Sequence, residues 1–133
     1  MLAISISCML LSAEQAFSAI YDGNTTITSN ITENSTINSG VEVTFTGTRT
    51  VNSGITFNNF GTINIGTSGT SSTLKNSGTI SGGIINVINK QLTNDTTGSI
   101  IANEINLSNS RVLANKGSVS VGKIILGAGT QVK

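Results

Sequence analysis

Residues that could carry catalytic chemistry are few in this chain and lie far apart. Among its 133 residues there is no histidine and a single cysteine, Cys8. A glycoside hydrolase needs a pair of carboxyl groups converging on one bond, and a calcium site needs a cluster of oxygen ligands. The acids that follow residue 19 are Asp22, Glu33, Glu42, Asp95 and Glu104, and we take Asp95 and Glu104, nine residues apart, as the candidate pair. We expect solvated acids, no catalytic, metal or cofactor-binding residue, no cofactor and no enzyme activity.

The composition indicates an all-β chain. Charged residues make up 10% and aromatic residues 4% of the sequence, and proline and tryptophan are missing. β-branched residues are frequent and regularly placed, which favours strands over disorder. The net charge is +1, and without residues 1–19, which contain Glu14, it becomes 7 − 5 = +2. That charge is too weak and too dispersed for nucleic-acid binding.

A short sequence motif, here called the repeated phrase, recurs along the chain and indicates its architecture. Its glycines are spaced by 17, 20 and 19 residues. A period of about 20 residues is typical of a solenoid, in which each coil buries its apolar face against its neighbours. The four copies are Asn59-Phe60-Gly61-Thr62-Ile63, Asn76-Ser77-Gly78-Thr79-Ile80, Thr96-Thr97-Gly98-Ser99-Ile100 and Asn115-Lys116-Gly117-Ser118-Val119.

Apolar residues keep fixed offsets from these glycines. The offsets are +2, +7, +9 and +14, and they define three short segments of period two, which means three strands per coil of 17–20 residues. We therefore predict a parallel β-helix whose equivalent residues stack about 4.8 Å apart. Two interior columns are expected, one of Ile80, Ile100 and Val119 and one of Val87, Leu107 and Leu126. The last offset places Leu92, Val112 and Gln131 in one column, with Val132 beside it.

The glycines have one predicted role, and the asparagines before them have two alternative roles. We expect the glycines to mark tight corners that need a positive φ. An asparagine two positions earlier can be a turn residue or a member of a hydrogen-bonded ladder. Asn59, Asn76 and Asn115 would form that ladder, with Thr96 interrupting it.

We divide the chain into three parts. Residues 1–19 are predicted to be a signal peptide, residues 20–54 an irregular cap or first coils, and residues 55–133 regular coils open at the C-terminal end. Before Gly61 the spacing between a glycine and the apolar residues that follow it differs by one residue from the later repeats. Regular coiling is therefore expected from about Gly61. Residues 66–72 lack apolar anchors and are expected to form a loop or a shortened face. The open last coil suggests a truncated product or the front piece of a longer protein.

The prediction of a signal peptide is based on an apolar run at residues 2–11 and on small residues at 13–19. No basic residue precedes the run, and a short buried or anchoring helix is the alternative. Cys8 would be discarded with the signal. We assign no role to the five asparagines in Asn-x-Ser/Thr sequences, which are Asn24, Asn30, Asn34, Asn94 and Asn106.

The repeats and the signal together resemble the passenger regions of Gram-negative autotransporters (type V secretion). The matching segments are Asn59-Phe60-Gly61-Thr62-Ile63-Asn64-Ile65-Gly66 and Asn76-Ser77-Gly78-Thr79-Ile80-Ser81-Gly82-Gly83, within a region covering about residues 41–132. The resemblance implies a right-handed β-helix displayed outside the cell, often as an adhesin. It also implies further coils and a C-terminal membrane β-barrel, for which this chain has no room.

The leading hypothesis is an exported, surface-exposed or extracellular module with a structural or adhesive role toward host-cell or other cell-surface molecules. A carbohydrate-active or tailspike-like β-helix is the alternative, and a nonfunctional truncated gene product is a third possibility. The alternative needs an aromatic sugar platform, whereas Tyr21, Phe45, Phe57 and Phe60 are expected to be mostly buried. The coil register predicts that Ile105→Asp is strongly destabilising and that Asn106→Asp, facing outward, is mild.

Overall fold

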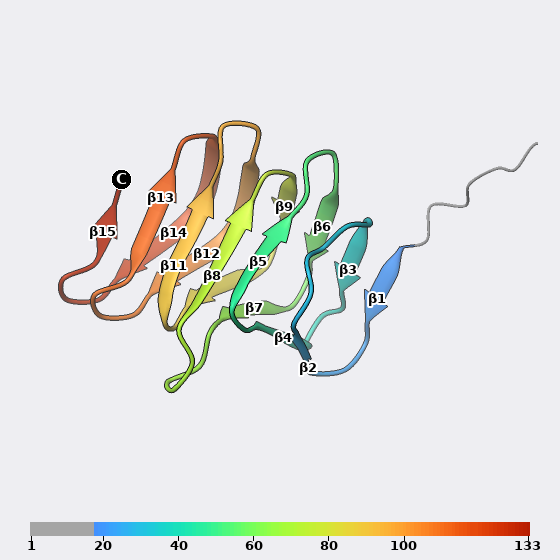
Figure 1. Ribbon diagram of the computed structural model, residues 1–133, viewed down its shortest axis with the longest axis horizontal. Coiled ribbons are helices and arrows are strands. Elements are labelled where there is room, and N and C mark those ends of the chain that lie inside the picture. The colour runs from blue at the N-terminus through green and yellow to red at the C-terminus, as the bar shows by residue number, and fades with distance from the viewer. Residues whose placement is uncertain (1–17) are drawn as a thin grey trace, which may run out of the picture.

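The computed structural model describes residues 18–133 and shows a parallel β-solenoid of about six turns (Figure 1). Within that range there is no helix, and the fifteen strands, β1–β15, follow one another along the chain. No described helix is long and apolar enough to cross a membrane. The signal peptide predicted for residues 1–19, with Cys8, lies almost wholly outside the described residues.

Each coil contributes to three stacks of parallel strands. The first stack contains β1 (Ala19–Tyr21), β3 (Ser35–Ile37), β6 (Thr56–Asn59), β9 (Thr79–Ser81) and the beginnings of β12 (Ser99–Leu107) and β14 (Ser118–Leu126). The second contains β2 (Thr25–Ile27), β4 (Glu42–Phe45), β7 (Thr62–Ile65), β10 (Ile84–Val87) and the ends of β12 and β14. The third contains β5 (Thr48–Val51), β8 (Ser72–Asn76), β11 (Lys90–Asn94), β13 (Val112–Asn115) and β15 (Gln131–Val132).

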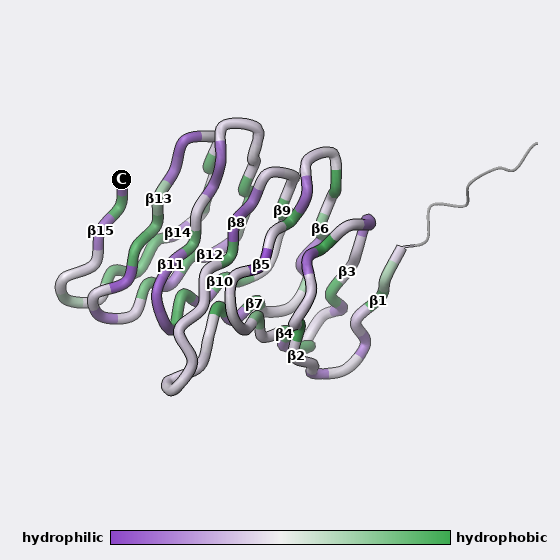
Figure 2. The backbone as a smooth tube through the Cα atoms, viewed as in Figure 1, coloured by the Kyte–Doolittle hydropathy of each residue, from purple (hydrophilic) through white to green (hydrophobic). Residues whose placement is uncertain are grey.

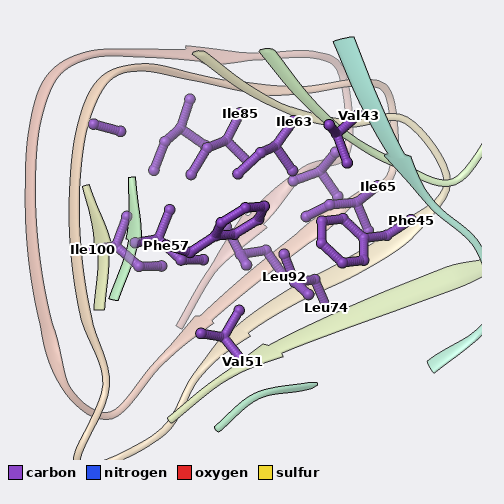
Figure 3. Close-up of a cluster of buried hydrophobic side chains, with 14 of the residues drawn as sticks. Val43, Phe45, Val51, Phe57, Ile63, Ile65, Leu74, Ile85, Leu92 and Ile100 are labelled. Carbon is purple, nitrogen blue, oxygen red and sulfur yellow. The ribbon is translucent and has the colours of Figure 1, made fainter. Parts of the chain in front are cut away.

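The two predicted interior columns are confirmed. Ile100 pairs with Ile80 on one side and Val119 on the other, and Leu107 pairs with Val87 and Leu126. Successive side chains of a strand face opposite sides, so one residue in two enters the coil. These inward side chains form a continuous core along the solenoid axis (Figure 3). The same apolar segments recur from coil to coil in Figure 2.

Aromatic rings fill the core of the first coils. Phe45 and Phe57 are fully buried, and their ring centroids lie 6.0 Å apart at an interplanar angle of 89°. Tyr21 packs edge-on against Phe57 at 6.1 Å. Paired strands also extend through residues 20–54, where we expected irregular coils. There Ser35 occupies an inward position, and its hydroxyl donates to the carbonyl oxygen of Glu33 at 3.0 Å.

The first copy of the repeated phrase lies at a different corner from the other three. Gly78, Gly98 and Gly117 each precede a strand of the first stack, whereas Gly61 precedes β7 of the second stack. Thr62 pairs with Ile84, so Gly61 is equivalent to Gly83. The one-residue difference in spacing before Gly61 is a separate effect: Thr56 pairs with Thr79, so Ile55 occupies the position of Gly78, and Gly54 lies one residue earlier at the same corner.

The offset of +14 is wrong in the last two coils. Leu92 pairs with Leu113, not with Val112, and Leu113 pairs with Val132. Five positions separate Val87 from Leu92, but six separate Leu107 from Leu113. The extra residue lies in the turn at Ser110, which adopts a φ of 59°. As predicted, residues 66–71 form a loop between β7 and β8, which protrudes from the coils in Figure 1.

The repeated glycines are needed for space and not for a positive φ. None of Gly61, Gly78, Gly98 and Gly117 is among the residues with positive φ. A Cβ on Gly78 would instead collide with the backbone oxygens of Ile55 and Asn52 in the preceding coil. The prediction about φ is thus wrong at these corners, because close approach between coils is what excludes a side chain there.

Candidate functional site: the outer faces of the coils

The acids singled out in the sequence do not converge on one groove. Asp95 lies at a corner, where its Oδ2 accepts a hydrogen bond of 3.0 Å from Ser77 Oγ. Glu104 lies on the outer side of the second stack. Glu42 occupies the same outward column as Glu104 but is separated from it by two intervening strands, a distance of roughly 14 Å at one strand spacing per layer. Within residues 18–133, no group of three or more metal-ligating side chains occurs.

Glu104 takes part in the ion pair of the described chain. Lys123 Nζ lies 3.3 Å from Glu104 Oε2, and Asn106 Nδ2 donates to Glu104 Oε1 at 2.8 Å. The hydrogen bond from Asn106 and then the contact with Lys123 hold the pKa of this carboxyl below its ordinary value. Lys123 is 62% and Glu104 25% exposed, so the pair lies at the surface of the coil.

An asparagine ladder runs beside this pair on the outer side of the second stack. Asn106 Nδ2 donates to Asn86 Oδ1 at 2.9 Å, and Asn86 Nδ2 donates to Asn64 Oδ1 at 2.9 Å. At its N-terminal end, Asn64 Nδ2 lies 3.4 Å from Glu42 Oε2. Our sequence reasoning missed this outer ladder. Its signal is the recurrence of Ile-Asn followed by an apolar residue at 63–65, 85–87 and 105–107.

A second ladder lies buried at the ends of the third-stack strands. Asn76 Nδ2 donates to Asn94 Oδ1, and Asn94 Nδ2 donates to Asn115 Oδ1, each at 2.8 Å. The prediction is correct for Asn76 and Asn115, but Asn94 and not Thr96 completes the ladder. The turn before Gly98 is two residues longer than in the neighbouring coils, so the asparagine lies four positions before the glycine.

Asn59 lies at the corner before Gly61 and is not a member of either ladder. It is fully buried, accepts a hydrogen bond from Gly61 N at 3.1 Å and donates to the carbonyl of Ile84 at 3.1 Å. The buried asparagines thus satisfy backbone groups where the chain turns, which is a structural role.

Three of the asparagines in Asn-x-Ser/Thr sequences accept hydrogen bonds from the backbone. Oδ1 of Asn24, Asn30 and Asn34 accepts hydrogen bonds from the backbone N–H groups of Glu42, Thr50 and Thr56, respectively, at the corners of the first coil.

The outer side of the first stack carries no charged side chain. We call it the hydroxyl face. Its strands alternate inward and outward residues, so the outward side chains, most of them polar, stand in straight columns. One column is formed by Thr56, Thr79, Ser99 and Ser118, and the other by Ile20, Thr36, Asn58, Ser81, Ile101 and Ser120. Ile20 and Ile101 are the exposed apolar members of this face. The arrangement offers many neutral hydrogen-bonding groups on a flat surface.

Phe60 stands at the border of the hydroxyl face. It follows the last residue of β6 and is 65% exposed, whereas Phe45 and Phe57 are fully buried. The expectation of buried aromatic residues therefore fails for Phe60, because it lies at a corner and not within a strand. It is the most exposed aromatic ring among the described residues.

A hollow of about 320 Å³ lies at the N-terminal end of the solenoid. Tyr21, Ile31, Glu33 and Ser35 contribute to its lining. Partial burial, and then the charge of Glu33, raise the pKa of the Tyr21 hydroxyl. The raised pKa keeps this phenol neutral, so it can donate a hydrogen bond into the hollow.

No known protein family matches the sequence, and no curated protein or solved structure is significantly similar to it.

Proposed function

We propose that this chain is an exported β-helical passenger of the autotransporter kind, placed at the cell surface or outside the cell, with a structural and adhesive role and without catalysis. The observation that carries the proposal is the hydroxyl face. It combines neutral hydroxyl and amide groups, a rigid backbone lattice and a repeat of one strand spacing.

Such a surface suits adhesion through many weak contacts. Each hydroxyl or amide contributes little in water, because its hydrogen bonds replace those to solvent. Repetition along the axis allows many of these contacts to form together, and linked contacts multiply the affinity. A repeating partner on a cell surface, such as a neutral polysaccharide, would match this repetition. The exposed ring of Phe60 adds an apolar contact at the border of the face.

The test is a binding assay with the face altered. Beads carrying the chain are incubated with cultured host cells and with immobilised cell-surface polysaccharides. Thr79→Glu combined with Ser99→Glu places two charges on the hydroxyl face, and we expect retention to fall at least about tenfold, equivalent to about 1.4 kcal/mol. Thr48→Glu combined with Gln91→Glu is the matched control, because it adds the same charges to one outward column of the third stack, away from the column of Lys75.

Circular dichroism of both variants must show an unchanged strand spectrum. Equal losses in the two variants, or no retention of the unaltered chain on any surface, would count against adhesion through the hydroxyl face. Release of reducing sugars from the polysaccharides would overturn the non-catalytic role and favour a carbohydrate-active β-helix.

A further inference from the structure

Charge is segregated along the solenoid axis. Residues 18–48, in the first coils, contain acids but no lysine or arginine, and residues 105–133, in the last coils, contain bases but no acid. The two groups lie at opposite ends of the molecule (Figure 1). The acids are Asp22, Glu33 and Glu42, and the bases are Arg111, Lys116, Lys123 and Lys133.

The last coil exposes the apolar columns that are buried elsewhere. Leu126 is 55% exposed and Val132 is 53% exposed, whereas their partners in the preceding coil, Leu107 and Leu113, are 2% and 1% exposed. Among residues 18–133, β14 has β12 on one side and no strand on the other. An apolar strand edge of this kind favours pairing with another strand.

The first coil has the register needed to continue the columns of Val119 and Leu126, but not the column of Val132, which leads through Leu113, Leu92 and Leu74 to Arg49. Successive pairings link Ala19 through Ser35, Phe57, Ile80 and Ile100 to Val119. A second set links Ile27 through Phe45, Ile65, Val87 and Leu107 to Leu126. A second copy displaced along the axis would therefore place Ala19 on Val119 and Ile27 on Leu126.

The same displacement brings opposite charges to a shared corner. Lys116, between β13 and β14, and Glu33, just before β3, both lie at the corner that leads into the first stack, and the coil of β1 stands between their two coils in this arrangement. Lys123 lies on the outer side of the second stack and is already paired with Glu104, so it takes no part in this match. Each end of one copy is thus complementary in charge to the opposite end of the next.

We propose that the chain associates head to tail with a second copy, the coil of β14 and β15 pairing in parallel with the coil of β1 and β2. The contact joins two different surfaces of the same chain. Such a heterologous contact does not close unless its rotation generates a ring, so the product is an open fibre. Charge at the corners sets the polarity of the contact, and the apolar columns and backbone hydrogen bonds hold it.

The experiment is a charge-swap mixture of full-length chains, followed by sedimentation velocity and electron microscopy. The unaltered chain is expected to form a concentration-dependent series of species, with a mean mass at least about threefold that of the monomer because the contact stays open. The series should shorten as ionic strength rises from about 0.02 to 0.5 M.

Two double variants then test the pairing of the ends. Lys116→Glu with Lys133→Glu makes both ends acidic, and Asp22→Lys with Glu33→Lys makes both ends basic. Each variant alone should remain monomeric, and their equimolar mixture should assemble again, because every contact then joins an acidic end to a basic one. Recovery in the mixture also shows that both variants are folded.

Three results would overturn the proposal. The unaltered chain could stay monomeric at low ionic strength, as expected if another segment covers the last coil. Either double variant could assemble alone as well as the unaltered chain does, which would indicate association without charge selection. The mixture could fail to assemble although both variants keep their strand spectra.

Discussion

Asn94 Nδ2 lies 2.8 Å from Asn115 Oδ1 and joins two successive coils in the buried ladder. The same nitrogen donates to the carbonyl of Ser118 at 2.9 Å, and Asn94 Oδ1 accepts from Asn76. One side chain with no exposed surface thus connects three coils at a corner where the strands end.

Replacing Asn94 by alanine should therefore be costly. Asn94→Ala leaves the half-buried Asn115 Oδ1 and the fully buried Asn76 Nδ2 each without one hydrogen-bond partner, and a buried unsatisfied group costs about 1–3 kcal/mol. We expect the free energy of unfolding in urea to fall by about 2–4 kcal/mol. Asn103→Ala is the matched control because Asn103 is exposed, and it should change stability by less than about 0.5 kcal/mol. Similar losses in the two variants would contradict a structural role of the ladder.

Alanine at Gly78 should destabilise far more than alanine at Gly69. The added Cβ at position 78 would collide with the carbonyl oxygens of Ile55 and Asn52, whereas the Cβ at position 69 would meet nothing within 4 Å. We expect Gly78→Ala to cost at least about 2 kcal/mol through the overpacking. Gly69→Ala should be neutral or stabilising by a few tenths of a kcal/mol, because it restricts the unfolded chain. Thermal and urea unfolding of the two variants measure the difference, and equal stabilities would refute the close approach of the coils.

The solenoid and its interior were predictable from the sequence because a parallel coil repeats its inward residues at nearly constant spacing. Ile80, Ile100 and Val119 show this directly. Turn lengths follow no such rule, since an extra corner residue changes no interior contact. For this reason the columns predicted for Val112 and Thr96 were wrong, whereas Gly61 was misplaced because the repeated phrase occurs at two kinds of corner.

For the outer faces, only the types of side chain could be predicted from the sequence. Their composition indicates threonine, serine and asparagine, but which of these side chains share a column depends on the strand pairing. Phe60 was expected inside because aromatic residues usually are buried, and its place at a corner is decided by the turn before Gly61.

Aspartate at Ile105 tests the interior assignment. Ile105 has no exposed surface, so a carboxyl group at this position would be desolvated without a partner. We expect Ile105→Asp to lower the free energy of unfolding by about 4 kcal/mol or more, or to prevent folding. Ile101→Asp in the same strand is the control, because Ile101 is 50% exposed and outward; its cost should be below about 1 kcal/mol.

Asn106→Asp is no longer expected to be mild. Asn106 Nδ2 donates to both Asn86 Oδ1 and Glu104 Oε1, and an aspartate would place a second carboxylate beside Glu104. Its cost should fall between those of Ile101→Asp and Ile105→Asp and should shrink at a pH where the carboxyls are protonated. Urea unfolding near pH 7 and near pH 4 measures this difference, and a cost independent of pH would contradict it.

The pH dependence of stability should contain a contribution from Glu104. Its pKa is lowered from 4.5 in the folded chain by Asn106 and Lys123. A depressed pKa in the folded state stabilises the fold above the unfolded pKa, and this stabilisation is lost as the pH falls through the folded value. Denaturant unfolding from about pH 6 to 3 should show that Glu104→Gln is less stable than the unaltered chain only at the upper end. A difference that persists at the acid end would assign the effect to packing instead of charge.

Extending the outer ladder by one asparagine should stabilise the last coil. Ile125 pairs with Asn106 and is 43% exposed, and Asn106 Oδ1 is buried without a hydrogen-bond partner in the described chain. An asparagine at position 125 can donate to that oxygen and continue the donor direction of the ladder. Ile125→Ala is the reference, since both substitutions remove the same exposed apolar side chain. We expect Ile125→Asn to exceed Ile125→Ala in free energy of unfolding by about 1 kcal/mol, and equal stabilities would mean that the ladder gains nothing from a further member.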